Sequence, residues 1–212
     1  MSARRVVLWR HGRTAWNAGS RFQGMTDVPL DDVGVAQAER AARDLATLEP
    51  DAIVSSDLDR ARMTAQALAD LVGLDVVTDE ALRETYAGDW QGLTRDEIVA
   101  RDGEAFALWV AGHDVRPGGG ESRTEVAARV SDAVRRHVAS LPAGGTLVVA
   151  THGGAARSGI GLLLGLPVEH WTVLGGLVNC AWSVLEEQPD GRWRLVEHNA
   201  RSLPEEVVGD EA

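Results

Sequence analysis

The sequence predicts an α/β fold with a mostly parallel central sheet that is covered by helices on both faces. Two observations predict it. Short apolar runs rich in β-branched residues recur along the 212-residue chain, and they alternate with longer segments whose apolar residues have helical spacing. The runs are apolar throughout rather than alternately polar, which is typical of strands buried on both faces of a parallel sheet. In such sheets ligands bind beyond the carboxyl ends of the strands, so we expect functional side chains there.

The first fifty residues predict a strand, a loop and a helix. The apolar run at residues 6–9 is a predicted buried strand, and it leads into an Arg-His-Gly sequence at 10–12. Residues 13–30 contain Gly, Asn, Asp and Pro and predict an irregular loop. Asp31 is a suitable N-cap for a helix over residues 31–48, where alanines and leucines recur at helical spacing.

The next segment predicts two further strands on either side of a helix. Residues 52–55 form a second apolar run. Residues 58–72 carry apolar side chains on one helical face, and Gly73 is a suitable end for that helix. Residues 74–77 are the third predicted strand.

Helices dominate the pattern that follows. Residues 94–112 predict one or two helices, and residues 113–120 predict a loop rich in Gly and Pro. The helix predicted over 121–140 has valines at four-residue spacing. Residues 146–150 are a fourth buried strand, and a helix over about 155–164 follows it.

The C-terminal part predicts a hairpin and a tail. Residues 178–186 and 191–197 are two strands that a Pro-Asp-Gly turn would join. The sequence has no internal repeat and no linker long enough to separate domains. We therefore expect one domain over residues 1–204 and a flexible acidic tail over residues 205–212.

The charge balance excludes partners that need a positive surface. The chain has 32 acidic residues against 21 basic ones, and all of the basic residues are arginines. A formal net charge of -11 without a basic run argues against binding to nucleic acid or to an anionic membrane. The single cysteine, Cys180, rules out an intramolecular disulfide. No apolar run approaches the roughly 18–20 residues of a membrane span, and we expect a cytoplasmic protein.

Two of the six histidines occupy positions where ligands are expected. His11 directly follows the first predicted strand and His152 directly follows the fourth. Each precedes a glycine, which lets the backbone approach a ligand closely. The other four histidines lack this context. Metal ligation is the weaker interpretation, because the sequence has no HxH, HxxxH or HExxH pattern and an arginine directly precedes His11.

Arginines close to the two histidines favour an anionic ligand instead. Arg10 precedes His11, and Arg60 falls in the first turn of a predicted helix, where its charge opposes the helix dipole. An arginine in such a place is better explained by a ligand, and its planar fork matches phosphate oxygens. Asp57 and Asp59 suit the start of the same helix, where we expect them to orient Arg60.

Glu84 completes a set of residues that suits a phosphate ester. It follows the third predicted strand and is therefore expected at the same edge of the sheet. Cleavage of a phosphate ester needs a nucleophile, cations for the phosphoryl oxygens and an acid for the leaving alkoxide. His11 can supply the first, the two arginines the second and Glu84 the third.

Four segments, in order along the chain, resemble the motifs of the histidine phosphatase (phosphoglycerate mutase-like) superfamily. Residues 10–17 (RHGRTAWN) are similar to the RHGxTxxN signature of that family, and similar motifs lie at residues 55–65, 82–92 and 151–154. The first of these alone would be a weak signal. The four together, at family-like spacing, identify the chain as resembling this superfamily.

The resemblance implies a three-layer α/β/α sandwich and a role for each candidate. His11 would be the nucleophile that becomes phosphohistidine. Arg10, Arg60 and His152 would hold the phosphoryl oxygens and stabilise the transition state. Glu84 would protonate the leaving oxygen and then activate water.

The same resemblance extends to the rest of the pocket and to the partners. Asn17, Gln23, Gly24 and the backbone of Gly153 would complete the pocket. No metal and no organic cofactor are implied. The implied ligand is a small phosphorylated metabolite, and the family suggests a homodimer.

Departures from the mutase pattern favour water as the phosphoryl acceptor. Mutases of this family carry a Tyr-Gly-x-Leu-x-Gly run and a longer basic insert, whereas this chain has Gly-Asp-Trp-Gln-Gly at 88–92 and only Arg116 in a short segment before Gly118. A phosphoglycerate mutase and a broad-specificity sugar or acid phosphatase remain alternatives. A non-catalytic phosphoanion-binding domain is a remote one, since a binder has no need of Glu84.

Three further segments resemble those of actinobacterial glucosyl-3-phosphoglycerate phosphatases. They are residues 88–94, 119–123 and 174–182. The resemblance implies glucosyl-3-phosphoglycerate as the substrate. Residues 103–120 include a Gly-rich stretch that is compatible with a lid over the site.

Overall fold

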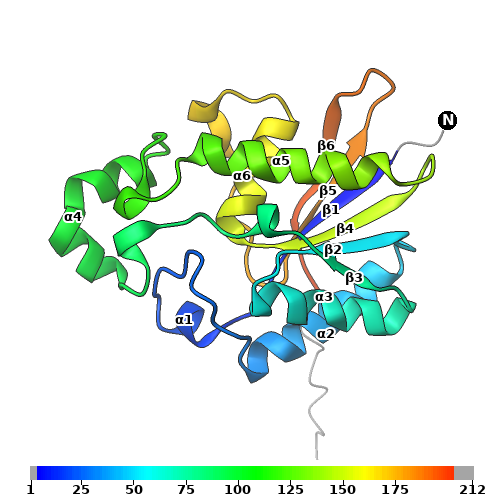
Figure 1. Ribbon diagram of the computed structural model, residues 1–212, viewed down its shortest axis with the longest axis horizontal. Helices are drawn as coiled ribbons and strands as arrows, with labels where there is room; N and C mark the ends of the chain where they lie inside the picture. The colour runs from blue at the N-terminus through cyan, green and yellow to red at the C-terminus, as the bar shows by residue number, and fades with distance from the viewer. Residues whose placement is uncertain (1–3, 203–212) are drawn as a thin grey trace, which may run out of the picture.

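A six-stranded sheet runs through the computed structural model, which describes residues 4–202 (Figure 1). The strands are β1 (Arg5–Arg10), β2 (Ala52–Ser55), β3 (Val76–Thr78), β4 (Thr146–Thr151), β5 (Trp182–Glu187) and β6 (Trp193–Ala200). Their order is β3-β2-β4-β1-β5-β6. β4 is parallel to β1 and β2, and β2 is parallel to β3, whereas β5 is antiparallel to both β1 and β6. The predicted α/β fold with a mostly parallel sheet is confirmed.

Four helices cover the two faces of the sheet in pairs. They are α2 (Asp32–Ala46), α3 (Asp59–Val72), α5 (Arg123–Ala139) and α6 (Gly153–Leu163). On β1, Val6 and Leu8 pack in one core with α5 and α6, whereas Val7 and Trp9 pack in a second core with α2 and α3. Successive strand side chains point to opposite faces, so one short apolar run serves both cores. Figure 1 shows the two helix pairs on opposite sides of the strands, which is the expected three-layer sandwich.

The three central strands end at the same edge of the sheet and place the residues that follow them side by side. All six residues of β4 are buried, as expected for the middle of a parallel sheet. Because β1, β2 and β4 are parallel, their carboxyl ends lie side by side. His11, Ser56 and His152 directly follow these ends. The topology therefore assembles the site from segments far apart in the sequence.

The C-terminal hairpin is present, but its first strand begins later than residue 178. β5 starts at Trp182, and residues 178–181 form a turn with Cys180 at a φ of 58°. In this turn Cys180 N donates to His11 O (3.3 Å), so the segment closes over the end of β1 instead of extending the sheet. The third strand is also shifted, to Val76–Thr78 from the expected 74–77.

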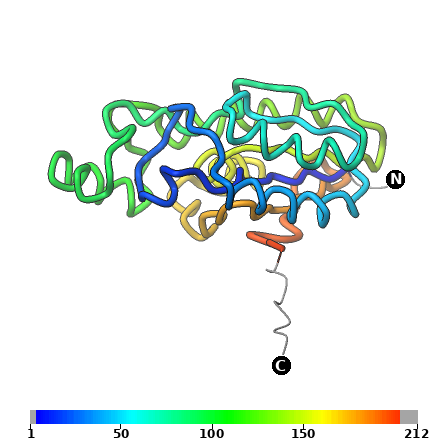
Figure 2. Tube along the Cα trace, turned by 90° about the horizontal axis from the view of Figure 1, so that it is seen from below, coloured from blue at the N-terminus to red at the C-terminus, as the bar shows by residue number. Residues whose placement is uncertain are grey.

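Helix α4 (Arg95–Val110) lies at one end of the molecule, away from the sheet (Figure 2). The helix is interrupted at Asp102, whose φ and ψ of -136° and 42° are not helical, which agrees with the expectation of one or two helices. Asp102 Oδ2 accepts a hydrogen bond from Nε1 of the fully buried Trp90 (2.8 Å). Trp90 and Phe106 form a small third core, against which Trp109 packs.

The Gly-rich stretch before α5 packs tightly against the segment that follows Glu84. A Cβ atom on Gly118 would lie 2.4 Å from Ala87 O, and one on Gly120 would lie 1.8 Å from Tyr86 O. These glycines therefore allow two backbones to touch. A lid over residues 103–120 remains a prediction.

Two predictions about the chain as a whole extend beyond residues 4–202. The acidic tail over residues 205–212 lies beyond the described residues, so its flexibility stays a prediction, as does the single domain over 1–204. Within residues 4–202, no helix is both long enough and apolar enough to cross a membrane.

Candidate active site

The carboxyl edge of the sheet borders a cavity of about 240 Å³. Eight of the nine predicted site residues line this cavity, namely Arg10, His11, Asn17, Gln23, Gly24, Arg60, Glu84 and Gly153. The ninth, His152, is fully buried beside His11, with a distance of 5.1 Å between the ring centroids. Residues that the sequence spreads over 144 positions thus lie together in space.

One ring nitrogen of His11 is bound and the other is free. Nδ1 lies 2.7 Å from Gly12 O, and because a carbonyl oxygen only accepts, Nδ1 carries the proton and Nε2 keeps its lone pair. The main chain is fixed by Asn179, whose Nδ2 donates to His11 O (3.1 Å). Burial, together with the charges of Arg10 and Arg60, holds the pKa of His11 well below 6.5. The geometry therefore presents a neutral imidazole with an available Nε2.

Arg60 is fully buried and is held by three acceptors. Its Nε donates to His152 Nδ1 (3.2 Å), and its two terminal nitrogens donate to Thr26 O (2.7 Å) and Gly24 O (2.8 Å). Since a guanidinium only donates, His152 Nδ1 is the acceptor and the ring proton lies on Nε2, which contacts Ser56 Oγ at 2.9 Å. Both nitrogens of His152 are thus engaged with protein atoms.

Burial lowers the pKa values of both Arg60 and His152. It lowers the pKa of Arg60 to about 10, so the guanidinium remains charged at neutral pH. The pKa of His152 lies well below 6.5, because burial and the charge of Arg60 both disfavour a second cation. The positive charge beside His11 is therefore carried by arginine, while the histidines are neutral.

Arg10 brings an unsatisfied donor to the cavity. One terminal nitrogen donates to Leu177 O (2.6 Å), but the buried Nε has no hydrogen-bond partner among the described residues. A Cβ atom on Gly153 would lie 3.4 Å from this Nε, so the guanidinium packs against the start of α6. The other terminal nitrogen makes no hydrogen bond within residues 4–202, and Arg10 lines the cavity beside His11. This nitrogen is therefore free to donate to an anion.

The N-terminus of α6 holds Glu84. Oε1 accepts hydrogen bonds from Thr85 N (2.8 Å) and Ala155 N (2.9 Å), and Oε2 accepts one from Gly154 N (3.0 Å). Each carboxylate oxygen has two lone-pair positions, so Oε2 keeps one open for a proton. A Cβ atom on Gly154 would lie 2.6 Å from Glu84 Oε1, so glycine is needed for this contact.

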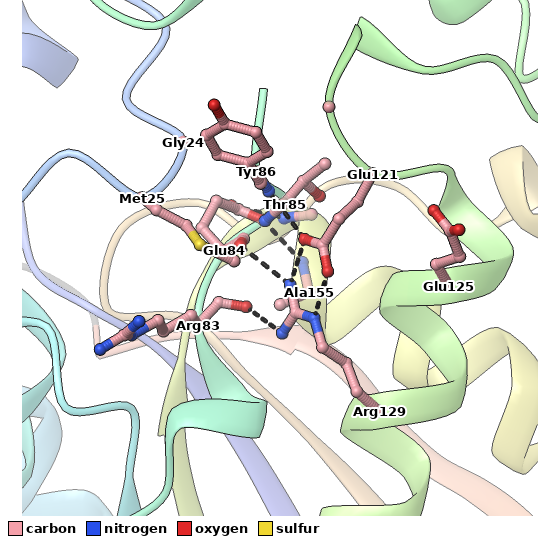
Figure 3. A network of polar contacts seen from close by, with 12 residues as sticks. Gly24, Met25, Arg83, Glu84, Thr85, Tyr86, Glu121, Glu125, Arg129 and Ala155 are labelled. Carbon is pink, nitrogen blue, oxygen red and sulfur yellow. Dashed lines mark hydrogen bonds and ion pairs between the residues drawn. The ribbon is translucent and has the colours of Figure 1, made fainter. Parts of the chain in front are cut away.

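A clamp from α5 fixes the backbone of the segment that carries Glu84 (Figure 3). Arg129 donates to Arg83 O (2.6 Å) and Glu84 O (2.9 Å). Glu121 accepts from Arg129 Nε (2.9 Å) and from Tyr86 N (2.8 Å). The two residues hold the backbone on either side of Glu84, while the N-terminus of α6 holds its carboxylate. This clamp could not be predicted from the sequence, since a charged pair near the start of a helix is common.

Three of the predicted pocket residues also have structural partners. Asn17 forms the capping box of the one-turn helix α1 (Ala15–Ala18) with Thr14, whose Oγ1 also donates to Gln23 Oε1 (3.0 Å). Gly24 has a φ of 53°, and a Cβ there would lie 2.2 Å from the Gln91 side chain. Its carbonyl is one of the three acceptors that hold Arg60. These residues shape the wall while still lining the cavity.

Two expectations about residues next to the site are wrong. Asp57 and Asp59 do not orient Arg60, because Asp57 pairs with Arg83 (2.5 Å) and Asp59 pairs with Arg62. Arg62 lies one turn along α3 from Asp59, and Arg83 reaches Asp57 from the segment that follows β3, so both carboxylates have partners other than the buried Arg60.

The second wrong expectation concerns Gly12. A Cβ on Gly12 would lie 2.4 Å from Gly34 O, so the close approach is to the N-terminus of α2 and not to a ligand. The sequence could not reveal this contact, because it joins the loop after β1 to the first turn of α2, 22 residues further along the chain.

Sequence reasoning missed eight further residues that line the cavity. They are Arg21, Phe22, Thr85, Trp109, Gly154, Arg157, Gly176 and Leu177. Arg157 lies four positions after Gly153 on α6 and hence on the same helix face. That spacing was a usable signal. Trp109 had none, since an aromatic residue within α4 is equally typical of a core position.

The arrangement combines a nucleophile, anion-binding donors and an acid at one place. Of the charged side chains that line the cavity, four are arginines and one is a glutamate. In the described part of the chain, no group of three or more His, Cys, Asp or Glu residues could hold a metal ion. The charge and the donors suit a phosphoryl group, and Nε2 of His11 is available to attack it.

Comparison with known proteins finds the same family and the same fold. The sequence model of the histidine phosphatase superfamily (branch 1) matches residues 6–201. A glucosyl-3-phosphoglycerate phosphatase of Mycolicibacterium vanbaalenii is 44% identical over 216 residues, which cover 94% of this chain and 96% of that protein. A probable phosphoglycerate mutase of Yersinia pestis is 36% identical over 184 residues, covering 86% of this chain and 85% of that protein.

Among solved structures, one similar protein is a mycobacterial glucosyl-3-phosphoglycerate phosphatase in complex with VO3. It superimposes with a TM-score of 0.89 at 45% sequence identity, covering 93% of this chain and all of that one. The similarity therefore extends over nearly the whole of this chain.

Proposed function

Because this chain belongs to branch 1 of the histidine phosphatase superfamily, we propose that it hydrolyses a small phosphomonoester through a phosphohistidine on His11. The observation that carries the proposal is the free Nε2 of a neutral His11 in the same cavity as Arg10, Arg60 and Glu84. A phosphoryl group would place its electrophilic phosphorus at Nε2 and its anionic oxygens at the arginines.

In the first step the lone pair of His11 Nε2 attacks phosphorus and the P–O bond to the alcohol breaks. Glu84, protonated on Oε2, gives its proton to the leaving oxygen. Free N–H groups of Arg10 and Arg60 donate to the phosphoryl oxygens, where negative charge increases in the transition state. The products of this step are the alcohol, phosphohistidine and the Glu84 carboxylate.

In the second step Glu84 acts as a base. Its carboxylate takes a proton from water, the oxygen of that water attacks phosphorus, and the P–N bond to His11 breaks. Inorganic phosphate leaves, the lone pair returns to Nε2 and Glu84 is protonated again. The cycle needs no cofactor, because the arginines provide the positive charge at the phosphoryl group.

His152 supports this chemistry through Arg60. Its Nδ1 accepts from Arg60 Nε, which fixes the angle of the guanidinium. Direct contact with a phosphoryl oxygen, which the family resemblance implies, would require Nε2 to exchange its bond to Ser56 Oγ for the ligand. We propose that the positioning role is permanent.

The proposed substrate is glucosyl-3-phosphoglycerate. It is supported by the 44% identity to a phosphatase named for that substrate over 94% of this chain. The weaker match to a probable phosphoglycerate mutase keeps mutase activity as the second candidate. A cytoplasmic location and a homodimer remain predictions.

A panel of phosphate esters tests the proposal. We expect phosphate release from glucosyl-3-phosphoglycerate in the presence of EDTA, with a higher kcat/KM than for sugar phosphates that lack the glycerate. The mutase is tested in parallel by the interconversion of 2- and 3-phosphoglycerate with 2,3-bisphosphoglycerate present. A mutase rate above the phosphatase rate, or a strict requirement for a divalent metal, would overturn the proposal.

A further inference from the structure

Arg157 is an arginine of the cavity that the proposed chemistry does not use. It lies on α6 one turn beyond Gly153 and lines the same cavity as Glu84. It makes no hydrogen bond and no ion pair with another residue of the range 4–202. Burial lowers its pKa, while the charge of Glu84 raises it. A half-buried cation without a partner is unusual, because desolvation is costly for a charge that is not paired.

A second arginine strengthens the positive field at this end of the cavity. Arg123 is 7% exposed and lies over the ring of Trp109, with 5.1 Å between its guanidinium carbon and the ring centroid. Its Nε is buried without a partner among the described residues. Burial and the charge of Arg157 lower the pKa of Arg123 to about 10. The two guanidinium groups therefore repel each other, and an anion between them and the cavity would relieve that repulsion.

The position of Glu84 indicates which part of the substrate lies near Arg157. Arg10 and Arg60 lie at the phosphoryl end with His11, whereas Glu84 must face the oxygen that leaves. Arg157 lines the same cavity and lies three residues after Gly154, whose N–H donates to Glu84, so both positions share the face of α6 that meets the acid. Trp109 also lines this cavity. An anion held by Arg157 would therefore belong to the alcohol part of the substrate.

We propose that Arg157 is a specificity-determining residue that binds a carboxylate of the leaving group, with Trp109 covering the carbon skeleton attached to it. The inference rests on the proposed phosphatase function, and it assigns a residue to the carboxylate that distinguishes phosphate esters of hydroxy acids from other phosphate esters. A planar guanidinium matches a carboxylate through two parallel hydrogen bonds, and an indole face suits the C–H face of a polyol or sugar.

Arg21 lines the same cavity but is a poorer candidate. Its guanidinium donates to Gly92 O (2.6 Å) and pairs with Glu97 (3.5 Å). Its charge is therefore already compensated at the rim. Arg157 is the cavity arginine whose charge has no such partner and no role at the phosphoryl group.

Two probes that differ only in the carboxylate test the inference. They are 3-phosphoglycerate and glycerol 3-phosphate, and the enzymes are the wild type, Arg157→Gln and Arg157→Lys. We expect Arg157→Gln to lower kcat/KM for 3-phosphoglycerate by about 10- to 100-fold, mainly through KM, because a charge-assisted hydrogen bond is lost. The rate with glycerol 3-phosphate should change by less than about threefold, and lysine should restore part of the discrimination. Arg135→Gln, on the exposed face of α5, is the matched control and should change neither rate.

Binding keeps the test independent of turnover. Calorimetric titration of the inactive His11→Ala protein with the two probes, with and without Arg157→Gln, should show the same selective loss for 3-phosphoglycerate. If the wild type prefers 3-phosphoglycerate but does not hydrolyse the glucosyl ester, the proposed substrate fails while the role of Arg157 holds. Equal losses for both probes, or no loss for either, would overturn the role of Arg157. The melting temperature of Arg157→Gln should not fall, since the substitution removes an unpaired charge next to Arg123.

Discussion

His11 is a nucleophile only while its Nε2 lone pair is free, and its neighbours keep that lone pair free. The carbonyl of Gly12 fixes the tautomer, and two arginines make a positive charge on the ring unfavourable. The same arginines stabilise the negative phosphoryl group. One set of charges therefore keeps the nucleophile neutral and binds its electrophile.

The two buried histidines predict a stability that falls in mild acid. Their pKa values are depressed in the folded state, so between about pH 6.5 and 5.5 protons bind preferentially to the unfolded chain. Each histidine should then reduce the free energy of unfolding by up to about 1 kcal/mol per pH unit below pH 6.5. Urea unfolding at pH 7.5, 6.5 and 5.5 measures this dependence. A His11→Asn variant should show a shallower dependence, and an unchanged slope would contradict the assignment of a neutral His11.

Glu84 is predicted to matter only when the leaving group needs a proton. Glu84→Gln keeps the shape of the side chain and removes its ability to give or take a proton. We expect its kcat/KM to fall by about 100- to 10,000-fold for alkyl phosphate esters. The loss should be much smaller for p-nitrophenyl phosphate, whose phenolate leaves unprotonated. Comparison of the two esters under the same conditions checks this, and equal losses would refute the acid role.

At the scale of elements, the N-terminus of α6 holds the carboxylate of Glu84 in place. Its first N–H groups, at Gly154 and Ala155, donate to Glu84, and the clamp of Arg129 and Glu121 holds the same segment from α5. An acid on a loop is thereby fixed between two helices. This explains how a residue outside the regular structure can keep the geometry that proton transfer requires.

Substitution of Gly154 should displace Glu84 without removing it. An alanine Cβ there would lie 2.6 Å from Glu84 Oε1, so the carboxylate must move from the helix N-terminus. We expect Gly154→Ala to reduce turnover of alkyl phosphate esters by about 10-fold or more, with a smaller effect on p-nitrophenyl phosphate. Gly175→Ala is the matched control, because a Cβ at Gly175 meets no atom within 4 Å. If both variants retain full activity, the fixed position of Glu84 is not needed.

At the scale of the whole molecule, the alternation of apolar runs and helical segments was enough to predict the sheet and its functional edge. Residues that directly follow strands, such as His11 and His152, could be placed because parallel strands end together. Arg60 could be singled out because its charge opposes the helix dipole. Arg157 was overlooked, although its four-residue spacing from Gly153 places both residues on the same face of α6. The contact of Gly12 with Gly34 was hidden because it is a tertiary packing contact.

The distribution of charge reconciles an acidic chain with an anionic ligand. The net charge of the chain is -11, yet four arginines and only one glutamate line the cavity. Such a local excess can attract a small anion over the distances at which charges are not screened. A polymer such as DNA, which needs an extended basic surface, would meet mostly negative charge.

The most direct test of the account is to trap the phosphoryl group on His11. Rapid acid-free quenching of the enzyme during turnover of a phosphate ester, followed by peptide mass spectrometry, should find phosphohistidine in the peptide that contains residue 11. The phosphoryl group should be stable to base and labile to acid. Phosphohistidine should be absent in His11→Ala, which should also lack turnover. A fully active His11→Ala protein, or a phosphoryl group on another residue during wild-type turnover, would contradict the central claim.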